Sequence, residues 1–299
     1  MQEYKSCALC PRMCGADRTK GVGYCGMGDN IVIARAAKHF WEEPFISGKN
    51  GSGAVFFSGC NLGCVYCQNY EISHGRKGTE ISTDELSAIF LRLQNAGAEN
   101  INLVNPTHFT PSIIKALESV RDSLKIPVVW NSGGYERAET VKKLDGLVDI
   151  YLPDLKYISG EISKKLSSAE DYFENAIEAI GEMLSQTGEP VFSENGMMKS
   201  GTVIRHLVLP GMTVQSMRIL AEIKKRFSEN TYISLMGQYF PSGEVDEAHF
   251  AEINRTLRHS EYTKTVRSLR SLGFENGCIQ SLEAADGYFV PDFSGKDII

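Results

Sequence analysis

The sequence lacks three features that would place it among secreted, membrane-bound or nucleic-acid-binding proteins. It has no excess of positive charge: its formal net charge is −6, whereas a general nucleic-acid binder is expected to be basic. It has no run approaching about 18 apolar residues, and no apolar segment follows Met1 as it would in a secretory signal. We therefore expect a cytoplasmic protein that binds neither nucleic acid nor membrane.

Cysteine is too scarce for a disulfide scaffold, with eight in 299 residues, yet seven of the eight lie within the first 67 residues. Clustering of this kind favours metal binding in a reducing compartment. The eighth, Cys278, lies in an apolar segment and is expected to be a buried structural thiol. Repeats and low-complexity tracts are also absent, so the length fits one large domain with an appendage.

Three cysteines form a tight group with the spacing C-x3-C-x2-C. They are Cys60, Cys64 and Cys67, and an aromatic residue, Tyr66, precedes the last of them. Three thiolates can hold three irons of a [4Fe–4S] cluster and leave the fourth iron open to chelate a small molecule. Zinc knuckles are usually built from separated pairs, so this triplet favours a catalytic cluster over structural zinc or buried thiols. An open-iron cluster is usually oxygen-labile, so we expect an anaerobic or low-oxygen cell.

Four further cysteines near the N-terminus have the spacing C-x2-C-x3-C-x10-C. They are Cys7, Cys10, Cys14 and Cys25. Glycines follow the third and fourth, and let backbone amides approach sulfur, which suggests a closed tetrahedral site. Structural zinc and an auxiliary [4Fe–4S] cluster fit equally, and plain reduced thiols are the third alternative. We expect residues 1–50 to form a Cys-rich extension whose folding energy comes from its metal.

From about residue 53, short apolar runs alternate with amphipathic stretches. The expected strands are Ala54–Ser58, Asn102–Val104, Val128–Trp130, Val148–Leu152, Val203–Leu209, Tyr232–Met236 and Cys278–Gln280. Most are separated by expected helices, at about residues 82–97, 112–123, 136–144, 169–185, 214–227 and 262–272. The first of these helices begins with a capping box, Ser82-Thr-Asp-Glu85, and the polar, turn-rich residues 192–201 are expected to form a loop or small hairpin. Such alternation predicts an α/β fold, a partial (β/α) barrel over residues 51–299, with its active site at the C-terminal ends of the strands.

Several longer segments resemble a known family. They are residues 9–15, 51–61, 67–69, 148–156 and 204–211. With the cysteine triplet, they resemble the radical S-adenosylmethionine (SAM) superfamily, in the subfamily called pyruvate formate-lyase activating enzyme-like, over residues 5 to about 293. The resemblance implies that SAM binds the open iron and is cleaved by one electron to a 5′-deoxyadenosyl radical, which abstracts hydrogen from a substrate. It also implies a flavodoxin- or ferredoxin-type reductant.

The resemblance assigns residues to SAM. Tyr66 would lie against the adenine. Where the activating enzymes carry a Gly-Gly-Glu loop, this chain has Val104–His108, so Asn105 and Thr107 would offer neutral oxygens in place of the acid. In the family, two acids and a hydroxyl surround a monovalent cation; one of those acids is replaced here by an amide, so the cation should bind more weakly or not at all.

The remaining residues expected at the SAM site lie after later strands. Those matching the cation site are Asn131, Ser132 and Asp154. Lys156 and Arg205 match basic residues near the SAM carboxylate, which needs a charged partner if buried. Gln238 follows a strand and is expected on the same rim.

Three functions fit these residues. The first is activation of a glycyl-radical enzyme, the partner that the resemblance implies. The second is the same radical chemistry on a small molecule or another peptide. The third is a non-catalytic iron–sulfur electron carrier, which would need neither an open iron nor a barrel.

Overall fold

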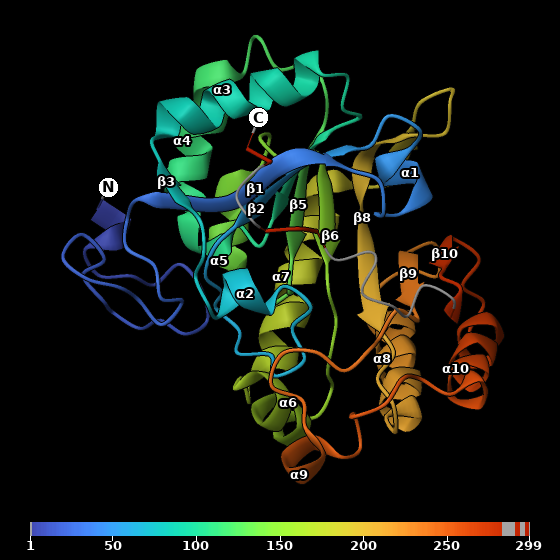
Figure 1. Ribbon diagram of the computed structural model, residues 1–299. Coiled ribbons are helices and arrows are strands. Elements are labelled where there is room, and N and C mark those ends of the chain that lie inside the picture. Colours follow the sequence, from blue (N-terminus) through green and yellow to red (C-terminus); the bar gives the residue numbers. More distant parts are fainter. Residues whose placement is uncertain (1, 283–290, 294–296, 299) are drawn as a thin grey trace.

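The computed structural model describes residues 2–282, 291–293 and 297–298. Its framework is one ten-stranded sheet with the order β10-β9-β8-β6-β5-β4-β2-β1-β3, and β7 pairs with β8 (Figure 1). The strands are β1 Ile31–His39, β2 Ser52–Phe57, β3 Thr79–Ile81, β4 Ile101–Val104, β5 Val128–Ser132, β6 Ile150–Pro153, β7 Val191–Phe192, β8 Met198–Leu207, β9 Tyr232–Met236 and β10 Gly277–Ile279.

The strands β2, β4, β5, β6, β8, β9 and β10 are parallel and follow one another across the sheet in chain order. The α-helices are α1 Pro44–Ser47, α2 Tyr70–Ser73, α3 Thr83–Asn95, α4 Thr110–Val120, α5 Ala138–Val141, α6 Gly160–Ser167, α7 Tyr172–Thr187, α8 Thr213–Arg226, α9 Glu247–Phe250 and α10 His259–Ser271. This α/β fold with a mostly parallel sheet is consistent with the expected partial barrel. Within the described residues, no pairing joins β10 to β3, so the sheet remains open there.

Local sequence signals account for the helix boundaries. At the start of α3, the Ser82 hydroxyl accepts a hydrogen bond from the Glu85 amide at 3.1 Å, and the Glu85 carboxylate accepts one from the Ser82 amide at 2.7 Å. This confirms the capping box expected from the sequence. The helix ends before Gly97, whose φ of +77° is the left-handed conformation that favours glycine.

Strand β1 was not expected, and it changes the role of the N-terminal segment. It pairs antiparallel with β2, with Ala37 opposite Ala54, and antiparallel with β3. Near the C-terminus, Ile298 forms a parallel bridge with Ala36. Figure 1 shows β1 crossing the sheet toward α1, which lies beside β8. The boundary expected at residue 50 therefore falls between two strands of the same sheet.

Apolar side chains fill the space between the sheet and its helices. Phe57, Leu103 and Trp130, from β2, β4 and β5, are fully buried in one cluster with Phe90 of α3 and Leu117 of α4. A second cluster lies under α7, α8 and α10. Burial of this apolar area is the main stabilising contribution to such a fold.

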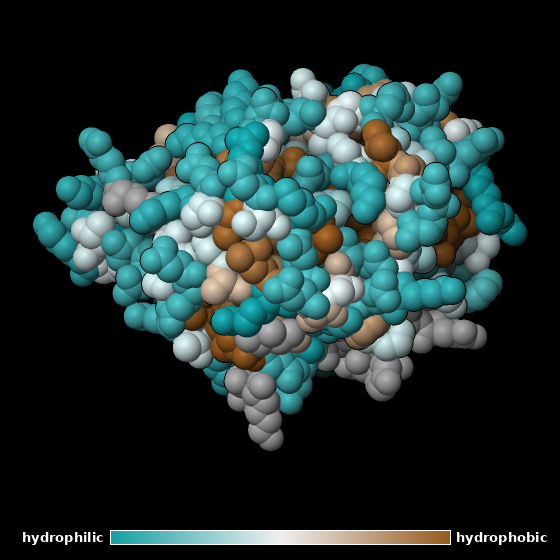
Figure 2. Space-filling model, turned by 90° about the horizontal axis from the view of Figure 1, so that it is seen from above, coloured by the Kyte–Doolittle hydropathy of each residue, from teal (hydrophilic) through white to brown (hydrophobic). Residues whose placement is uncertain are grey.

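The outer surface carries no large continuous apolar face in the view of Figure 2, where apolar residues lie in separate patches between polar ones. None of the helices in the described residues has the length and apolar character needed to cross a membrane.

Candidate active site

The C-x3-C-x2-C triplet lies in the loop between β2 and α2, and each of its sulfurs accepts a hydrogen bond. The Leu62 amide lies 3.4 Å from the Cys60 sulfur. The Ser167 hydroxyl lies 2.9 Å from the Cys64 sulfur, and the Ser73 hydroxyl lies 3.2 Å from the Cys67 sulfur. Donors of this kind orient metal-binding thiolates and tune the potential of a cluster.

The three thiols are close enough to affect one another. Burial raises the pKa of Cys60, and the neighbouring Cys64 and Cys67 raise it further. Burial likewise raises the pKa of Cys64 to about 11. A positively charged metal centre must therefore replace these protons if the thiolates are to form. Three mutually close, hydrogen-bonded sulfurs fit the ligand set of a cluster with one open iron.

In the described part of the chain, no three His, Cys, Asp or Glu side chains are arranged around the position of one metal ion. That result bears on single ions. In a [4Fe–4S] cluster each thiolate binds a different iron, so the three sulfurs need not converge on one point.

A cavity of about 220 Å³ opens beside the triplet. It brings together most of the residues expected at the SAM site with several that were not expected. Its lining includes Cys64, Tyr66 and Cys67, then Asn131, Asp154, Lys156, Arg205 and Gln238, and also His39, Trp41, Glu42, Gln68 and Asn69. The placement of polar residues after successive parallel strands thus produces one convergent site, as the barrel prediction required.

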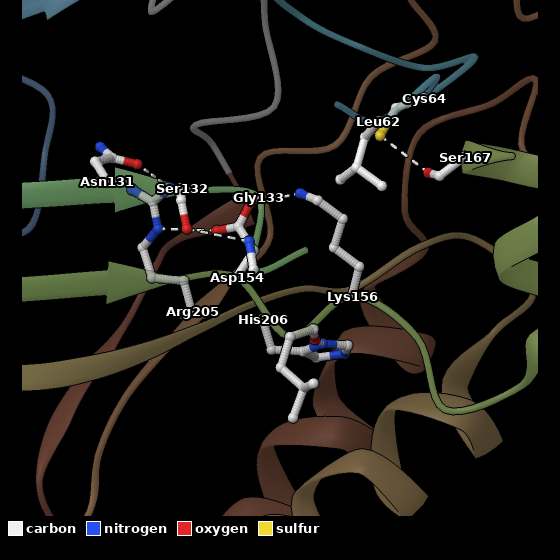
Figure 3. Close-up of polar contacts among 12 residues, drawn as sticks. Leu62, Cys64, Asn131, Ser132, Gly133, Asp154, Lys156, Ser167, Arg205 and His206 are labelled. Atoms are coloured by element: carbon white, nitrogen blue, oxygen red, sulfur yellow. Dashed lines mark hydrogen bonds and ion pairs between the residues drawn. The ribbon is translucent and has the colours of Figure 1, made fainter. Parts of the chain in front are cut away.

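Arg205 of β8 organises the charged part of this cavity. Its Nε donates to Asp154 Oδ1 at 3.0 Å and its Nη2 donates to Asn131 Oδ1 at 2.7 Å. Its Nη1 lies 3.3 Å from Glu42 Oε2. Figure 3 shows Asp154 between Arg205 and Lys156. The guanidinium is therefore fixed by three acceptors on three different segments.

Asp154 and Lys156 form a second charged contact at the same place. The Lys156 ammonium donates to Asp154 Oδ2, and both side chains are largely buried. Burial alone would raise the pKa of Asp154, but Lys156 and Arg205 outweigh burial and hold that pKa below its usual range. The carboxyl group is therefore ionised at neutral pH, and the Lys156 ammonium stays charged beside the cavity.

The acceptors expected for a monovalent cation are already engaged. Asn131 and Asp154 accept from Arg205. The Ser132 hydroxyl accepts from the Gly134 amide at 3.3 Å, and Ser132 does not line the cavity. The guanidinium thus supplies positive charge among the groups that would otherwise hold a cation.

Asn105 and Thr107 do not line the cavity. Asn105, with a φ of +57°, uses its side chain to bind the loop before the triplet: its amide donates to the Gly59 carbonyl, and its oxygen lies 3.4 Å from the Cys60 sulfur. The Thr107 hydroxyl donates to buried Glu136 at 2.7 Å. Both side chains therefore make hydrogen bonds outside the cavity, and neither occupies the place of the acid in the Gly-Gly-Glu loop.

Glu42 supplies a carboxylate that the sequence analysis missed. It lies between β1 and α1, its side chain is 11% exposed, and it lines the cavity. Its Oε1 accepts from Asn102 Nδ2 at 2.9 Å and from Asn131 Nδ2 at 3.2 Å. The signal that could have found it is the pair Glu42-Glu43 within an otherwise apolar stretch before Pro44.

Tyr66 and Gln238 border the cavity from opposite segments. The Tyr66 ring is buried, and its hydroxyl hydrogen-bonds to that of Tyr157. The Gln238 carbonyl accepts from Gln68 Nε2 at 3.2 Å, which ties the end of β9 to the triplet loop. An aromatic ring fixed at the wall of the cavity can pack against a heterocycle.

The N-terminal cysteines lie close to one another and to the triplet loop. Burial raises the pKa of Cys10 to about 12, with smaller contributions from nearby Cys25 and Cys7. Gly59, just before the triplet, has a φ of +80°, and a Cβ added there would lie 2.6 Å from the Cys25 carbonyl oxygen. The two cysteine groups are therefore joined through a close backbone contact at Gly59.

Two buried or half-buried arginines reinforce this contact. Arg18 donates to the Met27 carbonyl at 3.1 Å and to the His108 carbonyl at 2.6 Å, and its Nη1 lies 3.7 Å from the Cys7 sulfur. Arg12 donates to the carbonyl of Asn61, inside the triplet loop, at 2.9 Å. Charge-assisted bonds of this kind fix the N-terminal segment against the site.

Comparison with known proteins agrees with the fold. A model of the radical SAM superfamily matches residues 54–223, more than half of the chain. The chain belongs to the radical SAM superfamily. Membership implies a [4Fe–4S] cluster and SAM binding. An uncharacterized protein of Methanocaldococcus jannaschii is 30% identical over 275 residues, which cover 88% of this chain and 74% of that protein.

Solved structures show the same fold at low sequence identity. Streptococcus suis SuiB bound to S-adenosylmethionine is 13% identical with a TM-score of 0.51, and the match covers 80% of this chain and 52% of SuiB. The structure of anSMEcpe with bound AdoMet is 18% identical with a TM-score of 0.51, covering 74% of this chain and 58% of that one. A spore photoproduct lyase structure with bound AdoMet is 13% identical with a TM-score of 0.50, covering 75% and 74%. The chain thus spans about half the length of SuiB.

Proposed function

We propose that this protein is an enzyme that cleaves SAM reductively at a cluster held by Cys60, Cys64 and Cys67. When bound, the reduced cluster supplies the electron that breaks the sulfur–C5′ bond of SAM, giving methionine and a 5′-deoxyadenosyl radical that takes a hydrogen atom from the substrate. The observation that carries the proposal is the charged cavity that Cys64 and Cys67 of the triplet line.

The residues of the chain would hold SAM through its charged groups. Lys156 offers an ammonium to the carboxylate of the methionine moiety, because it is the basic group in the cavity that is bonded to one acid only. Asn131 and Glu42 offer oxygens to its amine. Arg205, which three acceptors hold, would act as a positioning residue for Asp154 and Glu42 rather than as a ligand.

Two classes of substrate fit this reaction. Resemblance to the activating enzymes supports the glycine of a glycyl-radical enzyme as the hydrogen donor, with a flavodoxin or ferredoxin as the reductant of the cluster. The alternative is a small molecule or a peptide. It is supported by the Asn105 and Thr107 contacts, which depart from the Gly-Gly-Glu arrangement of those enzymes. It is also supported by SuiB, which has been solved bound to the precursor peptide SuiA.

Electron paramagnetic resonance separates these substrates. The reconstituted enzyme is incubated without oxygen with SAM, a reductant and each glycyl-radical enzyme of the source genome. A doublet glycyl signal that needs both SAM and this protein would support activation. Absence of the signal with every such partner, while 5′-deoxyadenosine still forms, would reject activation and leave the small-molecule or peptide alternative.

We further propose that Cys7, Cys10, Cys14 and Cys25 bind a second metal centre, zinc or an auxiliary [4Fe–4S] cluster. Support comes from the proximity of Cys10 to Cys25 and Cys7, from that of Cys14 to Cys7, and from the contact of Arg18 with the Cys7 sulfur. In the described part of the chain these thiols do not surround one point, so a single zinc would require them to move closer together. Metal analysis of a variant with Cys60, Cys64 and Cys67 all changed to alanine distinguishes the two metals. About four residual irons would indicate a cluster and one zinc a structural site; neither metal would refute the second centre.

A further inference from the structure

A second cavity, of about 200 Å³, adjoins the one assigned to SAM. Trp41, Glu42, Arg205, Met236 and Gln238 line both cavities. The second cavity is also lined by Glu43, Pro44, Ser234, Cys278, Ile279 and Gln280. It therefore lies at the open end of the sheet, where the segment between β1 and α1 faces β8, β9 and β10.

Glu43 is the unusual member of this second cavity. Its side chain is 7% exposed, and its Oε2 has no hydrogen-bond partner among the residues that the structure describes. The Ser234 hydroxyl bonds to the carboxyl group, and the Cys278 thiol lies 3.3 Å from that hydroxyl. Cys278 was expected to be a buried structural thiol; it is only half-buried and faces this cavity.

With Glu43 ionised, the charges around the two cavities would not balance. Three carboxyl groups line them, from Glu42, Glu43 and Asp154, against the two cations of Lys156 and Arg205. The donors of Arg205 are bonded to Asp154, Glu42 and Asn131, so none of its bonds goes to Glu43. Burial lowers the pKa of His39, the other basic residue in the lining, to about 4, which leaves it neutral.

An ionised carboxylate without a partner is costly to bury, and it gains most from a cation that enters the same space. Burial raises the pKa of Glu43, and Arg205 offsets this only in part, so an entering cation would also draw the proton off the carboxyl group. The two cavities are similar in volume, about 220 and about 200 Å³, and the second adjoins the first through five shared residues.

We propose that this second cavity is the substrate site and that Glu43 binds a cationic nitrogen group of the substrate, an ammonium or a guanidinium. The inference rests on the proposed function, because it takes the adjoining cavity to hold SAM. The shared walls place such a group next to SAM, where hydrogen abstraction would occur. Substrates with an anionic group at this position would be rejected by Glu43 and Glu42.

Simple probes test the charge preference without knowledge of the substrate. Isothermal titration of the cluster-loaded enzyme, saturated with SAM, compares n-butylammonium with 1-butanol and butyrate, which have similar chains but different charge. The ammonium is expected to bind at least about tenfold more tightly than either. Equal binding of the three, or a preference for butyrate, would overturn the proposal.

Variants of Glu43 then test whether this residue causes the preference for the ammonium. Glu43→Gln should abolish the tenfold advantage of the ammonium, whereas Glu43→Asp, which keeps the charge, should retain part of it. Glu118→Gln, which changes an exposed glutamate on α4, should behave as the wild type. If Glu43→Gln folds cooperatively and keeps the full advantage, Glu43 is not the binding group. Formation of 5′-deoxyadenosine is measured separately, so failure of SAM chemistry is distinguished from failure of this inference.

Discussion

Among single residues, Asp154 is central to the charged site, because it joins two cations: Arg205 of β8 and Lys156 of the loop after β6. Its pKa lies below the usual range, so it stabilises the folded state at pH values above the unfolded-state pKa of about 3.9, and this contribution is lost as the pH falls through the lower folded-state pKa. Asp154→Asn leaves Lys156 and Arg205 poorly compensated and should cost about 3 kcal/mol near pH 7. Chemical denaturation from pH 7 to pH 3 should show a smaller loss of stability on acidification in the variant; parallel curves would contradict this.

Glu42 should matter for SAM because it fixes both Arg205 and Asn131. Glu42→Gln removes a charged partner from a largely buried guanidinium, and a hydrogen bond to a charged group contributes about 1.5–3 kcal/mol. The dissociation constant for SAM should therefore rise about tenfold or more, measured by equilibrium binding to the cluster-loaded protein. Exposed Glu118→Gln is the matched control. An unchanged constant would place Glu42 outside the SAM site.

At the scale of elements, the triplet loop depends on the N-terminal segment packed against it at Gly59. Gly59→Ala would place a methyl group 2.6 Å from the Cys25 carbonyl oxygen and 2.5 Å from a Met27 side-chain carbon. Gly97→Ala is the matched control, since Gly97 also has a positive φ and nothing within 4 Å of an added Cβ. In the control, backbone strain should lower the free energy of unfolding, measured by chemical denaturation, by about 1 kcal/mol. Gly59→Ala should lower it by more, and that variant should bind fewer irons per chain after reconstitution. Equal effects of the two substitutions would refute the contact.

The elements that the sequence predicted well are those with strong local signals. The capping box marked α3, and the parallel strands after residue 51 were found because each is a short apolar run followed by an amphipathic helix. Strand β1 was missed because Ile31–His39 contains three alanines, which are depleted in strands, and because its pairing with β2 depends on contacts distant in sequence. The predicted hairpin before Val203 is present, as β7 and the first residues of β8.

In the site, too, the sequence predicted correctly only what local patterns of residues encode. The spacing of Cys60, Cys64 and Cys67 is local and could be interpreted directly. Glu42 and Glu43 line the cavities only because β1 crosses the sheet, so that the residues after it lie beside β8 and β9 (Figure 1). No local pattern in the sequence encodes that crossing. Asn105 and Thr107 were assigned by position along the chain. Their side chains turn toward the triplet loop and Glu136 instead, which depends on the packing behind the strands.

At the scale of the whole molecule, the open sheet explains the arrangement of functions. Parallel strands direct polar residues to one edge, the triplet loop lies beside that edge, and the unpaired end at β10 leaves room for a second cavity. The N-terminal segment packs against the triplet loop, through the Cys25 carbonyl near Gly59 and the Arg12 bond to the Asn61 carbonyl, and so supports that loop. The fold is that of the radical SAM superfamily, while the substrate depends on the side chains that line the cavities.

The central claim is that the three sulfurs beside the charged cavity carry reductive SAM cleavage. The most direct test is anaerobic incubation of reconstituted protein with SAM and dithionite, with 5′-deoxyadenosine and methionine quantified by chromatography. Wild-type protein should form both in equal amounts, and the variant with Cys60, Cys64 and Cys67 changed to alanine should form neither while retaining a cooperative unfolding transition. Formation of 5′-deoxyadenosine by that variant at the wild-type rate would contradict the account.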